Sequence, residues 1–198
     1  MAVIHRTTLV PGKLDLLAGW LPAQNWYIKT AAARPELSKA GGFRLDDPDG
    51  EVGIEFMIVL DESAGAGKAA AYLVPMTYRG SPLEDGSDAL IGTTEHGVLG
   101  TRWIYDGTSD LVLLTQLGEL IQGRAEAQAQ SETNVPDPTV LSSPLAMAAG
   151  DGLHFHFTRL LTPAGGAPAE PGQVTGLWTR PDGAGVRSVF VTSERVPA

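Results

Sequence analysis

Residues 51–60 read EVGIEFMIVL, and residues 70–79 read AAYLVPMTYR. In the first stretch, apolar residues recur at every second position from Val52 to Leu60, and the far half is apolar at almost every position. A period of two is typical of a β-strand, and a continuous apolar run indicates burial on both faces. Pro75 in the second stretch cannot donate a backbone hydrogen bond, so we expect that strand to lie at a sheet edge or to bulge there.

Two other segments show the leucine spacing of amphipathic helices. Residues 12–21 carry leucines at i, i+3 and i+7 and are flanked by prolines, which favour a helix start and a helix stop. Residues 109–123 carry a wider leucine-rich stripe, begin with Ser109 as a suitable N-cap and end at Gly123. Residues 25–42, which follow the first of these segments, are expected to form a loop.

The composition changes after the second helical segment. Residues 124–138 are polar and end in two prolines, as in a linker. Three later segments have strand patterning, namely residues 153–161, 174–180 and 186–192. We therefore predict an α+β fold in which an antiparallel sheet is joined by two main helices. The predicted domains are a first domain over 1–123, a linker over 124–138, and a β-rich three-strand extension over 139–198 that packs on the first domain.

Charge and cysteine content exclude several classes of function. The 198 residues contain 14 Lys and Arg against 23 Asp and Glu, for a net charge of −9, which opposes binding to nucleic acid or to an anionic membrane. There is no cysteine, so disulfides and thiolate chemistry are excluded. Since no apolar run reaches the ~18–20 residues that span a bilayer, and residues 1–13 do not resemble a signal peptide, we expect a cytoplasmic protein.

The histidines and one tryptophan are the residues that could bind a ligand. His154 and His156 form a His-x-His pair, which on a strand projects two ring nitrogens from the same face. No third ligand follows at a familiar spacing, so we predict histidines that face solvent or a second layer, and no metal site. His96 lies between apolar segments, and the glycines beside it allow a tight turn that would orient its ring, although a lone histidine is more often structural. Trp178 could stack on a sugar, but core packing is the commoner role.

Three stretches share a signature: WLPAQNWY at 20–27, YLVPMTYR at 72–79 and WIYDG at 103–107. In this order they resemble the N-terminal cap domain of actinobacterial maltokinases, which phosphorylate maltose on the route from trehalose to glycogen-like α-glucan. The residues that carry the resemblance are Trp20, Pro22, Gln24, Trp26, Tyr27, Pro75, Tyr78, Arg79, Trp103, Tyr105 and Asp106.

The resemblance implies an α+β unit with a curved antiparallel sheet and a role in carbohydrate metabolism. Maltokinases also have a kinase-like lobe with a catalytic-loop aspartate and a metal-binding aspartate, which phosphoryl transfer requires. Neither motif is found in the 198 residues of this sequence, so no catalytic residue of the family can be transferred to it. The resemblance therefore implies a cap-like protein with no kinase activity of its own and no cofactor.

Two functions remain open. The first is a non-catalytic interaction or regulatory protein. Its protein partner is unknown, and the resemblance implies a sugar kinase or an enzyme that acts on α-glucan. The second is a small-ligand or sugar-binding protein, or an enzyme, with a pocket between the cap and the C-terminal strands. In that case His96, His154, His156 and Trp178 are the candidate ligand-binding residues.

Overall fold

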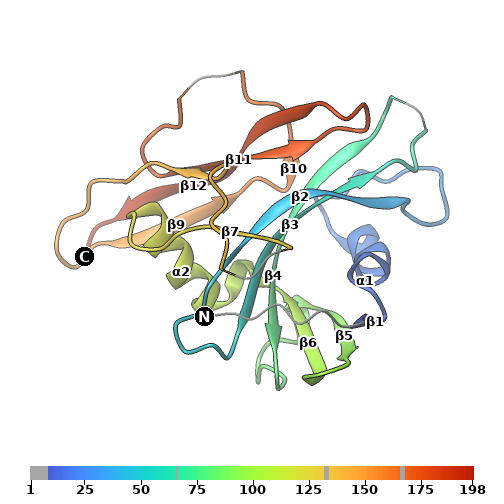
Figure 1. Ribbon diagram of the computed structural model, residues 1–198, viewed down its shortest axis with the longest axis horizontal. Helices are drawn as coiled ribbons and strands as arrows, with labels where there is room; N and C mark the ends of the chain where they lie inside the picture. Colours follow the sequence, from blue (N-terminus) through green and yellow to red (C-terminus); the bar gives the residue numbers. More distant parts are fainter. Residues whose placement is uncertain (1–8, 66, 132–133, 166–167) are drawn as a thin grey trace.

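The computed structural model describes residues 9–65, 67–131, 134–165 and 168–198. Across this part of the chain, one open sheet of twelve strands dominates, with 41% of residues in strands and 15% in helices. The predicted α+β class is therefore wrong, because the two α-helices are short and the fold is largely β (Figure 1). The expectation about a signal peptide concerns mainly residues 1–8, which lie outside the described residues.

The sheet is antiparallel, and its main path runs β1-β5-β6-β4-β3-β2-β11-β12-β9. Three two-residue strands flank this path, because β10 pairs with β4, β7 with β2 and β8 with β11. The strands are β1 (Leu9–Val10), β2 (Leu37–Leu45), β3 (Gly53–Asp61), β4 (Ala70–Arg79), β5 (Leu90–His96), β6 (Gly100–Asp106), β7 (Gln128–Ala129), β8 (Leu141–Ser142), β9 (Gly152–Phe157), β10 (Leu160–Leu161), β11 (Gln173–Thr179) and β12 (Gly185–Val196).

The alternation of β3 divides the hydrophobic core between the two faces of the sheet. Phe56 and Ile58 contribute to a core cluster on the α2 side, whereas Met57 and Val59 contribute to a cluster on the α1 side. All four side chains are at most 3% exposed. The prediction that this strand is buried on both faces is thus confirmed, and the sheet requires cover on each side.

One helix covers each face (Figure 1). Helix α1 (Lys13–Trp20) continues into the 3-10 helix η1 (Leu21–Ala23) and buries Leu17. Helix α2 (Leu111–Ile121) packs its leucine stripe on the other face. Two further 3-10 turns are η2 (Ser87–Ala89) and η3 (Gly107–Ser109). Neither α-helix in the described residues has the length that a bilayer crossing requires.

The second predicted helix is confirmed, with one correction at its start. The N-cap is Asp110 and not Ser109, since the Asp110 carboxylate accepts a hydrogen bond from the backbone N–H of Val112. Ser109 belongs to η3, which tightens the chain before the helix. Gly123 has a φ of +72°, the left-handed conformation that ends many helices, as predicted.

Pro75 lies inside the sheet, which corrects the expectation of an edge strand. On one side, residues 70–78 of β4 pair with β3, and Pro75 is opposite Phe56. On the other side β6 pairs with residues 76–79, and β10 pairs with residues 71 and 72. Pro75 falls between these two partners, where no sheet hydrogen bond needs its missing N–H.

Residues 37–42, which were expected to form a loop, belong to strand β2. These residues lack the β-branched and aromatic types that favour strands, but pairing with β3 orders them. Gly41 lies opposite Trp178 of β11, and a Cβ on the neighbouring Gly42 would lie 2.0 Å from the Phe56 carbonyl oxygen. Glycine is thus required where the N-terminal and C-terminal strands join.

The three predicted C-terminal strands are present with shifted bounds. The segment predicted as one strand, residues 153–161, is divided between β9 and β10, which pair with different strands. Within the predicted linker, β7 pairs with β2. The division of the chain into two domains and a linker stays a prediction, because pairing within a sheet does not define folding units.

Candidate functional site

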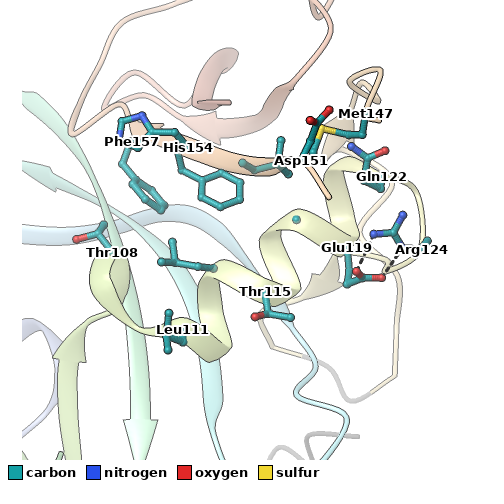
Figure 2. Close-up of a pocket in the computed structure, with 14 residues that line it drawn as sticks. Thr108, Leu111, Thr115, Glu119, Gln122, Arg124, Met147, Asp151, His154 and Phe157 are labelled. Carbon is teal, nitrogen blue, oxygen red and sulfur yellow. Dashed lines mark hydrogen bonds and ion pairs between the residues drawn. The ribbon is translucent and has the colours of Figure 1, made fainter. Parts of the chain in front are cut away.

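A groove of about 640 Å³ lies between helix α2 and strand β9 (Figure 2). Alternation along β9 turns Leu153, Phe155 and Phe157 towards α2, where they meet the exposed side of the helix. The helix lies close to this floor at Gly118, where an added Cβ would make an ordinary van der Waals contact with the Leu153 side chain, at 3.6 Å. Leu111 stands at one end of the groove and is 77% exposed. The groove therefore offers an apolar floor that is open to solvent.

Polar side chains surround this floor. Glu119 and Arg124 form an ion pair at one end, with 2.6 Å between Nε and the carboxylate (Figure 2). Asp151 accepts a hydrogen bond from the backbone N–H of Ala148 and pairs with Arg195. An apolar floor with a polar rim is typical of a binding groove for a small amphipathic ligand.

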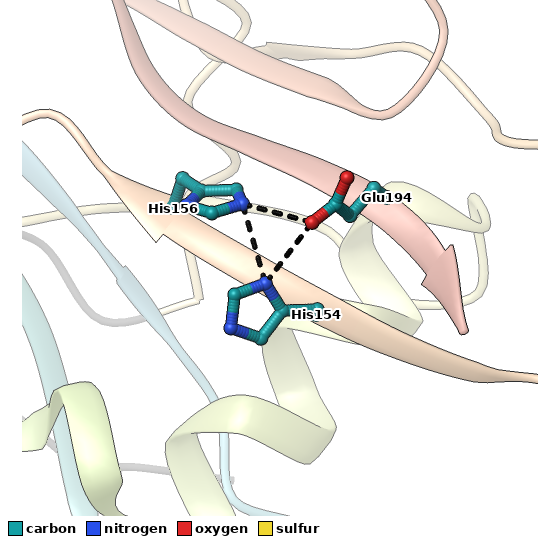
Figure 3. A group of neighbouring side chains, drawn as sticks. All are labelled: His154, His156 and Glu194. Carbon is teal, nitrogen blue, oxygen red and sulfur yellow. Dashed lines mark hydrogen bonds and ion pairs between the residues drawn. The ribbon is translucent and has the colours of Figure 1, made fainter.

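The structure brings two of the four predicted ligand-binding residues together. His154 and His156 project from the face of β9 opposite to its phenylalanines, and their rings meet Glu194 of β12 (Figure 3). His154 also lies at the lip of the groove. Glu194 was missed, because the predicted strand stopped at Thr192 whereas β12 continues to Val196.

The other two predicted residues lie elsewhere and do not line the groove. His96 ends β5, and its Nδ1 accepts hydrogen bonds from the backbone N–H groups of Val98 and Leu99, so it stabilises the β5–β6 turn. Trp178 is 6% exposed, and its indole N–H donates to the Ser188 hydroxyl at 2.9 Å. Its ring belongs to the core cluster under α2.

The signature residues at the end of β4 form buried polar contacts. Arg79 donates two hydrogen bonds to the Asp110 carboxylate, at 2.9 and 2.7 Å, and the hydroxyl of Thr77 donates a third. Burial alone raises the pKa of Asp110, but these bonds and the positive charge of Arg79 hold the pKa below its usual value. The ion pair thereby joins β4 to the start of α2.

A second buried carboxylate, Glu55, lies on β3, the neighbour of β4 in the sheet. Tyr78 and Lys13 donate to Glu55 at 2.5 and 2.6 Å, and Gln130 donates to its other oxygen. Burial raises the pKa of Glu55, yet the Lys13 ammonium and these hydrogen bonds outweigh it, so the pKa lies below its usual range. Burial and the neighbouring Glu55 charge raise the pKa of Tyr78 well above its ordinary value.

The remaining signature residues also make contacts within the fold. Asp106 pairs with Arg159 from the loop after β9, and the Arg159 guanidinium lies over the Trp26 ring. Tyr27 donates to Asp61 at 2.6 Å, and the Tyr105 hydroxyl accepts from the backbone of Leu83. The Trp20 and Trp26 rings pack against each other, and the Gln24 side chain donates a hydrogen bond to the Trp20 carbonyl. Pro22 lies in η1, and Trp103 lies opposite Arg79 in the sheet.

Comparison with known proteins agrees with this signature. No curated protein matches the chain. The family model of the maltokinase N-terminal cap domain matches residues 20–110, from the first signature tryptophan to the N-cap of α2. The resemblance predicted from the sequence is therefore confirmed for this segment: residues 20–110 match the maltokinase N-terminal cap domain.

Proposed function

We propose that this chain is a non-catalytic, cap-like protein of maltose, trehalose or α-glucan metabolism, which acts in the cytoplasm by binding a protein partner. The observation that carries the proposal is the cap-domain match over residues 20–110, combined with the contacts of its polar signature residues. Those side chains bond to other residues of the fold, and none of them lines the groove beside α2.

The chemistry of phosphoryl transfer supports the non-catalytic part of the proposal. Such a reaction needs carboxylates that hold Mg²⁺ and that orient the acceptor hydroxyl. The signature carboxylate Asp106 is 13% exposed and paired with Arg159, and the neighbouring Asp110 is 2% exposed and held by Arg79. A carboxylate with a bidentate arginine partner has few lone pairs left for a metal ion.

The partner is a sugar kinase or an enzyme that acts on α-glucan, the classes that the maltokinase relationship supports. The test is affinity capture from extract of the native cells, with mass spectrometry of the captured proteins. The proposal expects specific enrichment of an enzyme of one of these two classes over a capture with an unrelated acidic protein. Enrichment of neither class in repeated captures would contradict it.

A second candidate function is binding of a sugar or another small ligand in the groove between α2 and β9. The apolar floor and polar rim of the groove favour it. Maltose is titrated into the protein by calorimetry, and saturable heat is expected. Gly118→Leu fills the floor while improving helix propensity and should abolish that heat. Gly19→Leu on α1, with nothing within 4 Å of its Cβ, is the matched control and should bind as the wild type does.

The two candidate functions give different results in these experiments. Saturable maltose binding that Gly118→Leu removes supports the groove as a sugar site. No heat with maltose, together with enrichment of a sugar kinase, supports the interaction protein alone. Equal binding by the Gly118→Leu and Gly19→Leu variants contradicts the assignment of the groove.

A further inference from the structure

Strands β9 and β12 place three metal-ligating side chains on one exposed face. The register sets Glu194 directly opposite His154, and His156 opposite Thr192. Because side chains alternate along a strand, both histidines project to the side that Phe155 does not occupy. Figure 3 shows the two rings and the carboxylate directed towards a common point.

The three ligand atoms form a nearly equilateral triangle. The Nδ1 of His154 lies 3.2 Å from the Nε2 of His156, and the Oε1 of Glu194 lies 3.3 and 3.1 Å from these two nitrogens. Tetrahedral zinc has bonds of about 2.0–2.1 Å, which places neighbouring ligand atoms about 3.3 Å apart. The triangle therefore has the dimensions of one face of a zinc coordination tetrahedron.

Hydrogen bonds alone do not account for all three contacts. Each of the two ring nitrogens carries at most one proton, and the carboxylate is ionised at neutral pH. Two protons at most are thus available for three close contacts, so one contact stays unbridged. A cation at the centre of the triangle would instead accept a lone pair from each of the three atoms.

We propose that His154, His156 and Glu194 form a binding site for a divalent ion of the zinc class. Two imidazoles and a carboxylate suit Zn²⁺, Co²⁺, Ni²⁺ and Cu²⁺ better than Mg²⁺ or Ca²⁺, which prefer oxygen ligands. The side chains are 58%, 58% and 65% exposed, so a hydrated ion reaches them without movement of the backbone. Three protein ligands leave a fourth position for water or for a ligand atom.

The core on the other side of β9 fixes the position of the ligands. Phe155 and Phe157 pack against the core cluster beside α2, which holds the strand in register with β12. Neighbouring positions on the metal-binding face carry Thr192 and Val196, neither of which is a cation. The net charge of −9 further favours the approach of a divalent cation.

Calorimetric titration of the untagged protein with ZnCl₂ tests the site. One ion per chain is expected to bind in the micromolar range, and no cysteine competes for it. The variants His154→Ala, His156→Ala and Glu194→Gln should each weaken binding by roughly tenfold or more, a loss that even outer-shell changes can cause. Far-UV circular dichroism should remain unchanged in all three, since the side chains are exposed.

A matched control uses His96, which lies in the turn between β5 and β6. His96→Asn keeps a hydrogen-bond acceptor for the turn at 98–99, and this variant should bind Zn²⁺ as the wild type does. Substitution with Co²⁺ should give the intense visible absorption of a four-coordinate site, which His156→Ala removes. Wild-type binding by the three cluster variants, or no saturation below millimolar Zn²⁺, would overturn the proposal.

Discussion

Loss of the Asp110 carboxylate should strongly lower the stability of the fold. This carboxylate caps helix α2 and accepts two hydrogen bonds from Arg79 and one from Thr77. In the variant Asp110→Ala, the helix loses its N-cap and the Arg79 guanidinium loses its partner. Both effects arise at the junction between β4 and α2, at the last residue of the cap-domain match.

The size of the effect follows from these contacts. Loss of an N-cap costs about 0.5–2 kcal/mol, and removal of one partner from a buried ion pair costs about 3–5 kcal/mol. The two costs share one carboxylate and are not additive, and the Arg79 side chain is 20% exposed, so water relieves part of its charge. We expect Asp110→Ala to lower the free energy of unfolding by about 3–4 kcal/mol. Asp110→Asn keeps the cap and should lose about half as much.

Guanidinium chloride denaturation followed by circular dichroism measures the difference. Asp182→Ala is the matched control, because this aspartate also accepts a backbone hydrogen bond but is 57% exposed in the β11–β12 turn. It should cost at most about 1 kcal/mol. A loss below about 1 kcal/mol for Asp110→Ala, equal to that of Asp182→Ala, would refute the view that the Arg79–Asp110 ion pair stabilises the fold.

Three more substitutions test other parts of the structure in the same denaturation assay. The pKa of Glu55 is lower in the folded protein than in the unfolded chain, so the ionised carboxylate stabilises the fold above about pH 4.5, and this contribution is lost as the pH falls. The variant Glu55→Gln should therefore lower the free energy of unfolding at pH 7 and make it depend less on pH in the acid range. Gly42→Ala should cost about 2 kcal/mol or more through its clash with the Phe56 carbonyl, whereas Gly19→Ala should be neutral or stabilising. Leu111→Lys, at a side chain 77% exposed, should change stability by less than about 0.5 kcal/mol. Three results would contradict these predictions: an unchanged dependence of stability on acid pH in Glu55→Gln, equal effects of the two glycine variants, or a large loss of stability in Leu111→Lys.

Local patterns predicted several elements correctly because one short stretch contained the whole signal. The period of two in β3 and the bounds of β4 could be read from adjacent residues. The leucine stripe and Gly123 likewise located α2. In each case, burial of one face and backbone chemistry act within about ten residues, so the sequence alone carries the information.

The fold class was missed because it depends on pairing between distant strands. The bridge between Gly41 and Trp178 joins strands about 140 residues apart, and no periodicity in either strand specifies its partner. Strand β2 has few strand-forming residues between Ser38 and Gly42 and owes its conformation to pairing with β3. Tertiary pairing thus outweighed local propensity, and the sheet became larger than the helices around it.

The histidine cluster illustrates the same limit at a site. His154 and His156 were correctly placed on one strand face, but their third neighbour, Glu194, lies 38 residues or more further along the chain. The only available signal was the continuation of the period of two beyond Thr192 into residues 193–196. The short loop between β11 and β12 predicts that these two strands pair, but it does not predict that β9 pairs with the other edge of β12.

The most direct test of the account is incubation of the purified protein with ATP, Mg²⁺ and maltose, followed by ³¹P NMR. A protein that binds without transferring phosphate leaves the phosphorus spectrum of ATP unchanged and forms no sugar phosphate. A sugar phosphate signal that grows with protein concentration, and that disappears in an Asp106→Asn variant, would contradict the account.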